Sequence, residues 1–222
     1  GIICNTLLVA VVGMAPARAS ANIHIVETFT TAVSGISHLI HGNIDRVLFL
    51  RLLIPGIIGG VSGAYLLTNI DAAVVKPFVL GYLVLTGVYL LVRGVMYPPR
   101  QRPARVVAPL GLIGGFLDAA GGGGWGPVVT SNLLVQGVEP RRVIGTVNSV
   151  EFFLTLTVSA TFISQLGLKD FAVASIGLLI GGIAAAPLGA VMAKRIPPRT
   201  MFILVGAVLS LTSAYGVMHA VG

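Results

Sequence analysis

Long apolar stretches separated by short polar gaps make up most of this chain. Those long enough to be membrane helices run approximately over residues 20–41, 46–68, 73–95, 143–166, 170–193 and 199–219. Each can span a bilayer once, because about 20 apolar residues cross its hydrocarbon core. The pattern predicts an all-α, polytopic membrane protein with six full spans.

Two further apolar runs, approximately 106–120 and 127–138, are too short to span comfortably. They flank a glycine turn, which we define as residues 121–127 with the sequence GGGGWGP. Irregular backbone at membrane depth is tolerated only where protein or a water-filled cavity surrounds it, since lipid cannot bond its amides. We therefore predict a helical hairpin that turns within the membrane and lines the protein interior.

The first half of the chain resembles the second half when it is shifted by 124 residues. Seven positions are identical on this ungapped diagonal: Gly13/Gly137, Pro16/Pro140, Arg18/Arg142, Val26/Val150, Glu27/Glu151, Phe29/Phe153 and Thr31/Thr155. His24 falls on Asn148, which is a chemically similar pair. The sequence thus predicts two repeats, each a glycine-turn hairpin followed by three membrane helices.

The predicted boundaries are residues 1–95 for repeat one, 96–105 for a basic linker and 106–222 for repeat two. The diagonal places residues 2–12 on the second arm of the hairpin. The first arm and the glycine turn of repeat one have no counterpart, so we expect the first repeat to be truncated at its N-terminus.

Charge placement predicts the orientation of the repeats. If the hairpin makes no net crossing, 11 of the 14 Lys and Arg residues fall on one side, and the other side keeps Arg18, Lys76 and Lys169. Cytoplasmic loops are enriched in Lys and Arg, so the 93–105 loop is predicted to be cytoplasmic. The equivalent loops 13–20 and 139–142 then lie on opposite sides. The repeats are therefore inverted, as in many secondary transporters.

The composition narrows the function classes. Hydrophobic residues are 55% and charged residues 9% of the 222 residues, and the mean hydropathy is +0.97, so lipid contacts most of the surface. The net charge of +7 does not indicate a nucleic-acid partner, because the basic residues occupy gaps rather than one stripe. One cysteine, Cys4, excludes an internal disulfide and a multi-cysteine metal site. We expect no metal or cofactor.

Glu27 and Glu151 are the most informative polar positions. A carboxylate in mid-span is costly and normally faces the bundle interior or a water-filled cavity. His24 precedes Glu27 by three residues and Asn148 precedes Glu151 by three, so each pair shares a helix face. We interpret the glutamates as candidates for proton coupling or gating. The alternative is that they only tie helices together.

The glycine turn is a candidate anion site. Its four consecutive glycines are Gly121, Gly122, Gly123 and Gly124. They allow close backbone approach, and Pro127 suits a first helical turn, whose free N–H groups attract anions. Asp118 would cap these amides or carry protons, and Trp125 would wall a cavity or anchor packing. A tight packing turn without a ligand is the alternative.

Small residues recur at four-residue spacing in two of the predicted spans. They are Gly56, Gly59, Gly60 and Gly63 in the first half, and Gly177, Gly181, Ala185 and Gly189 in the second. This spacing is typical of closely packed helices, and we interpret it as packing.

Three stretches carry a family resemblance: DAAGGGGWGP at 118–127 with Gly137 and Pro140, GTVNSVEF at 145–152, and NIHIVE at 22–27. Together they resemble the TauE/SafE sulfite exporter family, also called the TSUP permeases, over nearly the entire chain. The resemblance implies transport of small anions, such as sulfite, sulfonates, sulfoacetate or related sulfur and carboxylate compounds, in the bacterial plasma membrane.

Carried over position by position, the resemblance assigns two groups of residues. The solute-binding candidates are Gly121, Gly122, Gly123, Gly124, Trp125, Asn148 and His24. The candidates for proton coupling or gating are Glu27, Glu151 and Asp118. The implied partners are a small anionic solute, the lipid bilayer and protons, and a transporter of this size can act alone or as an oligomer.

Two other function classes stay open at this point. One is an intramembrane enzyme or metal-dependent factor that uses His24 and Glu27, which share a helix face and would need further ligands. The other is a membrane scaffold in which the charged residues only hold helices together. The sequence contains no ATP-binding motif that would drive transport directly.

Overall fold

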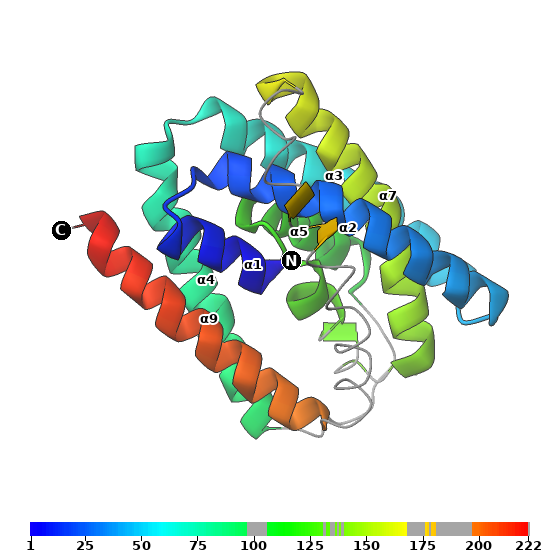
Figure 1. The fold of residues 1–222 in the computed structure, drawn as a ribbon. Coiled ribbons are helices and arrows are strands. Elements are labelled where there is room, and N and C mark those ends of the chain that lie inside the picture. Colours follow the sequence, from blue (N-terminus) through cyan, green and yellow to red (C-terminus); the bar gives the residue numbers. More distant parts are fainter. Residues whose placement is uncertain are drawn as a thin grey trace.

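The computed structural model describes residues 1–96, 106–130, 132–133, 136, 138, 140–167, 176–177, 179–180 and 197–221. All regular structure in these residues is helical. The long helices are α2 (Pro16–Ile40), α3 (Arg46–Asn69), α4 (Ala72–Val95), α7 (Pro140–Leu166) and α9 (Pro198–Val221) (Figure 1). The predicted all-α class is confirmed, while the predicted span 170–193 falls largely outside the described residues.

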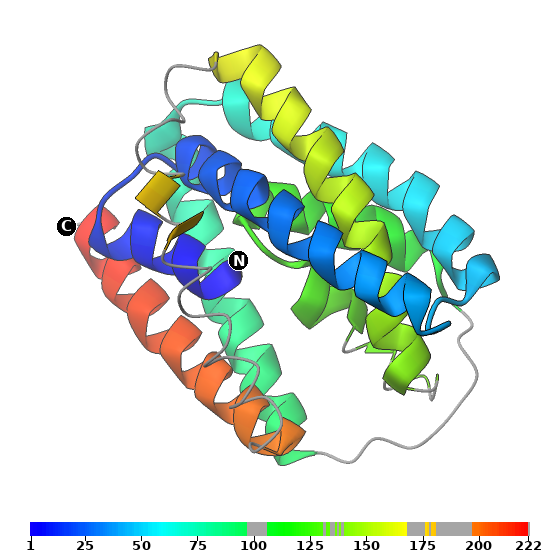
Figure 2. The same ribbon diagram turned by 45° about the vertical axis from the view of Figure 1, so that its right-hand side comes forward.

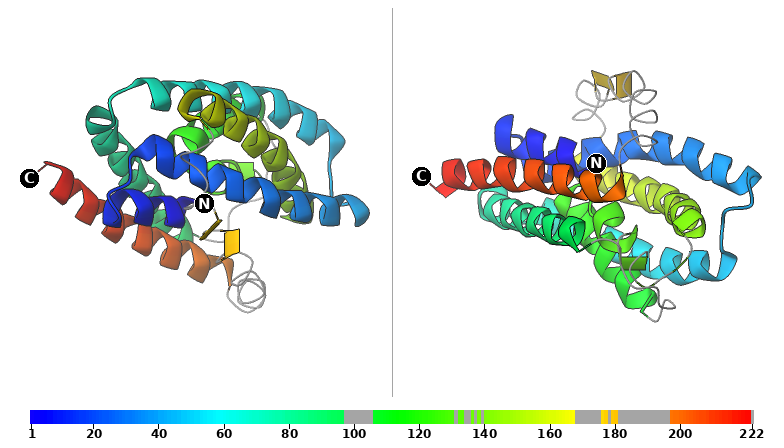
Figure 3. Two further views of the ribbon diagram at one scale, coloured as in Figure 1. Left: turned by 45° about the horizontal axis from the view of Figure 1, so that its top comes forward. Right: turned by 90° about the horizontal axis from the view of Figure 1, so that it is seen from below.

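Shorter helices fill the space between the long ones. A first pair, α1 (Ile2–Thr6) and the π-helical η1 (Leu7–Val11), lies beside α9 in both views of Figure 3. The predicted hairpin consists of α5 (Ala108–Gly121), the glycine turn and the π-helical η2 (Gly126–Thr130). Its first arm is thus helical as predicted, and its second arm begins at the end of the glycine turn.

Local sequence explains where the long helices begin. Pro16 and Pro140 occupy the first position of α2 and α7, where the missing N–H of proline has no helical partner to lose. Asp45 caps α3, because its Oδ1 accepts from the amides of Val47 and Leu48 at 3.0 Å each. Asp71 caps α4 in the same way. These caps place the helix ends at the predicted gaps.

Three described helices are long and apolar enough to cross a bilayer: Arg46–Asn69, Pro77–Val95 and Arg142–Leu166. The apolar part of α9 is shorter, at Phe202–Met218. The prediction of six full spans is therefore confirmed for three. Helix α2 has the length of a span, but its apolar run contains several polar side chains, of which Ser20, Asn22 and His24 are buried.

Helices α2 and α7, which the repeat places in equivalent positions, pack side by side. The rings of His24 and Phe162 lie 6.1 Å apart near one end, and Gly35 faces Ser149 near the other. Higher numbers on α2 therefore meet lower numbers on α7. The two helices are antiparallel neighbours (Figure 2).

The second equivalent pair, α4 and α9, packs in the same manner. Gly87 of α4 lies against Ser210 of α9, and Gly94 lies against Ile203, so these helices are also antiparallel. Figure 2 shows both pairs as neighbouring ribbons.

Glycines bring the backbones of α3 and α5 into direct contact. A Cβ added to Gly59 would collide with the carbonyl of Leu112, and one added to Gly115 would collide with the carbonyl of Gly56. Gly63 meets the carbonyl of Phe116 in the same way. The interpretation of this spacing as helix packing is confirmed for α3. Because the glycine turn follows directly after α5, the contact between α3 and α5 also sets the position of the turn along α3.

The substitution Gly59→Ala should destabilise the protein, because its Cβ has no room against the α5 backbone. Overpacking of this kind costs about 1–3 kcal/mol, which thermal unfolding in detergent will show as a lower midpoint. Gly81→Ala is the matched control, since nothing lies within 4 Å of a Cβ at that helical position. An unchanged midpoint for Gly59→Ala would contradict the close contact.

Candidate functional site

Asp118 organises the glycine turn. Gly122 and Gly123 have φ values of +64° and +125°, which glycine adopts without strain, and their amides donate to the backbone carbonyl of Asp118. The amides of Gly124 and Trp125 donate to Asp118 Oδ1 at 2.6 and 2.9 Å. Four consecutive amides therefore donate to one residue. Of the two roles considered for Asp118, the structure displays the cap.

The other oxygen of Asp118 joins the turn to α2. Its Oδ2 lies 3.1 Å from His24 Nε2, and both side chains are almost completely buried. His24 Nδ1 lies 2.8 Å from the carbonyl of Ser20, which can only accept, so Nδ1 carries a hydrogen. Nε2 and Oδ2 then share one proton. The pair is either an imidazolium with a carboxylate or a neutral imidazole with a carboxylic acid.

A second contact strengthens the junction between α2 and the hairpin. Ser20 Oγ donates to the carbonyl of Ala119 at 2.5 Å, and it also lies 3.3 Å from His24 Nδ1. Ser20 is completely buried. Because Ala119 is in the last turn of α5, this bond closes the end of that helix against α2.

Two residues that the sequence analysis did not single out form the walls of the turn. Asn5 of α1 donates through Nδ2 to the carbonyl of Gly121 at 2.5 Å, and its side chain covers Gly122. The ring of Tyr82 covers Gly121, and a Cβ on Gly124 would lie 2.5 Å from its hydroxyl oxygen. Both residues are polar positions within apolar runs, which is the signal that could have identified them.

Trp125 anchors the turn within the core. It is completely buried, and its indole packs against Gly56 and Gly114. Its Nε1 donates to the carbonyl of Val147 at 3.2 Å. Of the two roles considered for Trp125, this geometry fits packing, and it ties the turn to α7.

The two candidate glutamates lie close to the same region. Glu27 Oε1 is 2.8 Å from the backbone nitrogen of Gly1, and Glu27 Oε2 is buried with no hydrogen-bond partner among the described residues. The electrostatic neighbours of the Glu151 carboxyl include Glu27 and Asp118. The Glu151 carboxyl of α7 is therefore close enough to feel the charge of an acidic side chain on α2 and of another on α5.

Asn148 lies apart from His24. Its Nδ2 donates to Ser34 Oγ at 2.9 Å, and Ser34 is ten residues beyond His24 on α2. Ten residues of helix correspond to about 15 Å. The structure thus brings together His24, Asp118, Gly121–Gly124 and Trp125, but it does not bring Asn148 to them.

The arrangement gives no support to a metal centre at His24 and Glu27. No group of three metal-ligating side chains occurs in the part of the chain that is described. Both ring nitrogens of His24 already contact oxygen atoms, of Ser20 and Asp118. A metal ion would have to break one of these contacts.

A separate pocket lies away from the glycine turn. It is a partly open hollow of about 460 Å³ between α2, α3 and α7, and its lining includes Phe49, Phe152 and Phe153. No residue of the glycine turn lines it. It is an apolar groove away from the polar site.

These observations define a class of protein. A helical chain with membrane-spanning segments and a buried polar centre on interrupted helices has the organisation of a membrane transporter. Residues 1–216 match the family described as Sulfite exporter TauE/SafE, and the chain belongs to this family.

A curated relative supports the assignment. The probable membrane transporter protein YtnM of Bacillus subtilis (strain 168) is 41% identical over 223 aligned residues, which cover 96% of this chain and 74% of the relative. No solved structure matches the chain. The family and the relative are membrane transporters, so the chain is a membrane transporter rather than an enzyme.

The substitution Asp118→Asn should loosen the turn. It removes the negative charge that accepts the hydrogen bonds from two backbone amides and that contacts His24. Breaking a buried charge pair costs about 3–5 kcal/mol, so the unfolding midpoint in detergent should fall. Trp125 is the only tryptophan and reports on the turn directly: its emission should shift to the red.

Asp45→Asn is the matched control, because Asp45 also accepts two backbone amides but caps a helix outside this centre. It should change stability little, because asparagine caps a helix about as well as aspartate does, and it should leave the emission of Trp125 unchanged. An Asp118→Asn protein with wild-type emission and wild-type midpoint would show that the cap does not hold the turn.

Proposed function

We propose that this protein is a secondary transporter of small anions, of the class of sulfite, organosulfonates or related sulfur and carboxylate anions. Its solute site lies at the glycine turn, at mid-depth in the membrane and between the two repeats. The observation that carries this proposal is the buried junction of His24, Asp118 and the turn. The description of the family as sulfite exporters supports the choice of anion.

The positions of the site residues along their helices support a site at mid-depth. Glu27 is near the middle of α2, Tyr82 is near the middle of α4 and Glu151 is near the middle of α7. A span of about 20 residues crosses the hydrocarbon core, so the middle of a span lies near its centre. The positions of these residues on three long helices therefore agree with a site near the centre of the membrane.

The packing of equivalent helices supports inverted repeats over residues 1–95 and 106–222. Repeats related by a two-fold axis in the membrane plane run in opposite directions, and both α2/α7 and α4/α9 are antiparallel pairs. The backbone of Gly123 also touches Ile2, whose equivalent on the 124-residue diagonal is Gly126. The hairpin of one repeat thus meets the equivalent segment of the other.

The turn already binds a carboxylate, which is the side chain of Asp118. We propose that the solute anion competes with Asp118 for the amides of Gly124 and Trp125. A proton that moves from His24 Nε2 to Asp118 Oδ2 leaves both groups neutral. The amides then lose their strongest acceptor and become available to an oxyanion.

The glutamates fit the same scheme. An anion that approaches Glu27 and Glu151 is repelled while they are charged, so their protonation would accompany its binding. Asn148 would contact the solute at another point of its path, because it lies about 15 Å along the helices from His24. Trp125 would hold the turn in position rather than touch the solute.

Flux in proteoliposomes tests the function. We expect the purified protein to move sulfite, a sulfonate or a small carboxylate, and we expect a pH gradient to change the rate. Glu151→Gln cannot carry a proton, so the part of the flux that depends on pH should fall at least about tenfold. Glu27→Gln should act in the same direction.

Asp71→Asn provides the control, because Asp71 is an exposed acidic residue that caps α4 outside the site. Its flux should equal that of the wild type. If the folded wild-type protein moved none of these anions, the proposed function would be wrong. Wild-type flux that does not respond to pH would support the transport of anions and would contradict its coupling to protons.

We also propose that the protein resides in the bacterial plasma membrane with the 93–105 loop in the cytoplasm. In a Cys4→Ser background, Gln101→Cys should react with an impermeant maleimide only after the cells are opened. Val221→Cys should react in intact cells, because the C-terminus would be extracytoplasmic. Labelling of Gln101→Cys in intact cells would show that the orientation is the opposite of the proposed one.

A further inference from the structure

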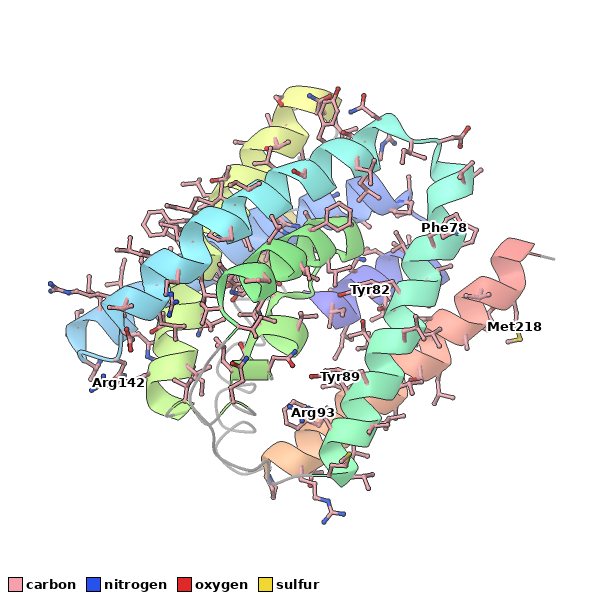
Figure 4. The ribbon with its side chains drawn as sticks, turned by 180° about the vertical axis from the view of Figure 1, so that it is seen from behind. Phe78, Tyr82, Tyr89, Arg93, Arg142 and Met218 are labelled. Atoms are coloured by element: carbon pink, nitrogen blue, oxygen red, sulfur yellow. The ribbon has the colours of Figure 1, made fainter. Side chains whose placement is uncertain are left out.

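One face of α4 carries two tyrosines and an arginine in a row. Tyr82, Tyr89 and Arg93 are spaced by seven and four residues, so at 3.6 residues per turn they lie within about 40° of one another around the helix. The row is about 16 Å long, since the helix rises about 1.5 Å per residue. Figure 4 shows the three side chains on the same side of α4.

The hydroxyl groups of this row lack the partners that buried hydroxyls need. The oxygens of Tyr82 and Tyr89 are both buried, and neither has a hydrogen-bond partner among the described residues. Buried hydroxyls are nearly always hydrogen-bonded, because an unpaired one has lost its bonds to water without replacement. Thr86 lies between Tyr82 and Tyr89, but its hydroxyl donates to the backbone carbonyl of Tyr82 and is not within hydrogen-bond geometry of either tyrosine hydroxyl. The two tyrosines are therefore donors that await an acceptor.

The row begins at the candidate site. The ring of Tyr82 covers Gly121, and its hydroxyl adjoins Gly124, whose amide donates to Asp118. A solute oxygen that reached the amide of Gly124 would come within reach of the Tyr82 hydroxyl. Tyr82 is thus placed to bind the solute at the turn.

The row ends at a cation. Arg93 occupies the last turn of α4, and its guanidinium carbon lies 5.7 Å from the centre of the Tyr89 ring. Residues 72–95 contain no Asp or Glu, so no negative charge on this helix opposes an anion. A fixed positive charge at a membrane boundary raises the local concentration of anions. The row offers hydrogen-bond donors over its whole length.

We propose that Tyr82, Tyr89 and Arg93 form the path of an oxyanion between the glycine turn and the end of α4. This inference rests on the proposed transport of anions. Arg93 draws the anion to the end of the helix, Tyr89 bonds it between that end and the turn, and Tyr82 delivers it to the turn. Hydroxyl groups that can donate, next to the fixed positive charge of Arg93, favour oxyanions over cations.

The test uses the full chain in proteoliposomes with sulfite as the probe. Tyr82→Phe and Tyr89→Phe keep the ring and remove only the hydroxyl, so they should fold and lower sulfite flux about tenfold each. Arg93→Gln should lower flux at low sulfite concentration and weaken its dependence on salt, and Arg93→Lys should restore part of it. Tyr65→Phe is the matched control, since Tyr65 is 56% exposed on α3, and its flux should equal the wild type.

Binding to the turn is measured separately through the emission of Trp125 during sulfite titration. Tyr82→Phe should weaken the apparent affinity about tenfold, whereas Tyr89→Phe should change flux more than affinity. Wild-type transport with unchanged flux and affinity in both tyrosine variants would overturn the path and leave the proposed function intact. Absence of wild-type flux of sulfite, of a sulfonate and of a small carboxylate would overturn the proposed function and the path together.

Discussion

The structure depends on the way Asp118 satisfies the backbone of the glycine turn. Lipid offers no hydrogen bonds, so an interruption of helix at membrane depth must find its partners within the protein. Asp118 accepts from four successive amides, two through its carbonyl and two through its carboxylate. The four amides from Gly122 to Trp125 therefore all find their acceptor within the protein. Neighbouring helices can then pack against the turn without leaving its amides unpaired.

Close packing around the turn is the second constraint. Gly122 must adopt positive φ, and side chains at Gly121 and Gly124 would collide with Tyr82. Farther along the hairpin, Gly115 lets α5 lie directly on the backbone of α3. The glycine content of this region thus serves two purposes. It permits the reversal of the chain, and it brings α1, α2, α3 and α4 within reach of one short segment.

A buried pair of histidine and aspartate is costly unless it is fully bonded or functional. Here His24 is bonded through both nitrogens, and Asp118 through both carboxylate oxygens. The pair shares one proton between Nε2 and Oδ2, so a shift of that proton changes the charge on the turn's acceptor. In the proposed transport of anions, this coupling between a proton and a set of amide donors would link proton movement to the binding of the anion.

The sequence by itself determined the helical class, the membrane environment and the family, because apolar length and the GGGGWGP motif are local properties. It also singled out Glu27 and Glu151 as costly polar positions, and His24 and Asp118 as candidates for the site. Their partners were decided only by tertiary structure. The pairing of His24 with Asp118 joins residues 94 positions apart, and the walls formed by Asn5 and Tyr82 come from separate helices. The separation of Asn148 from His24 follows from the antiparallel packing of α2 and α7, because equivalent positions on such a pair lie away from each other unless they are near its centre.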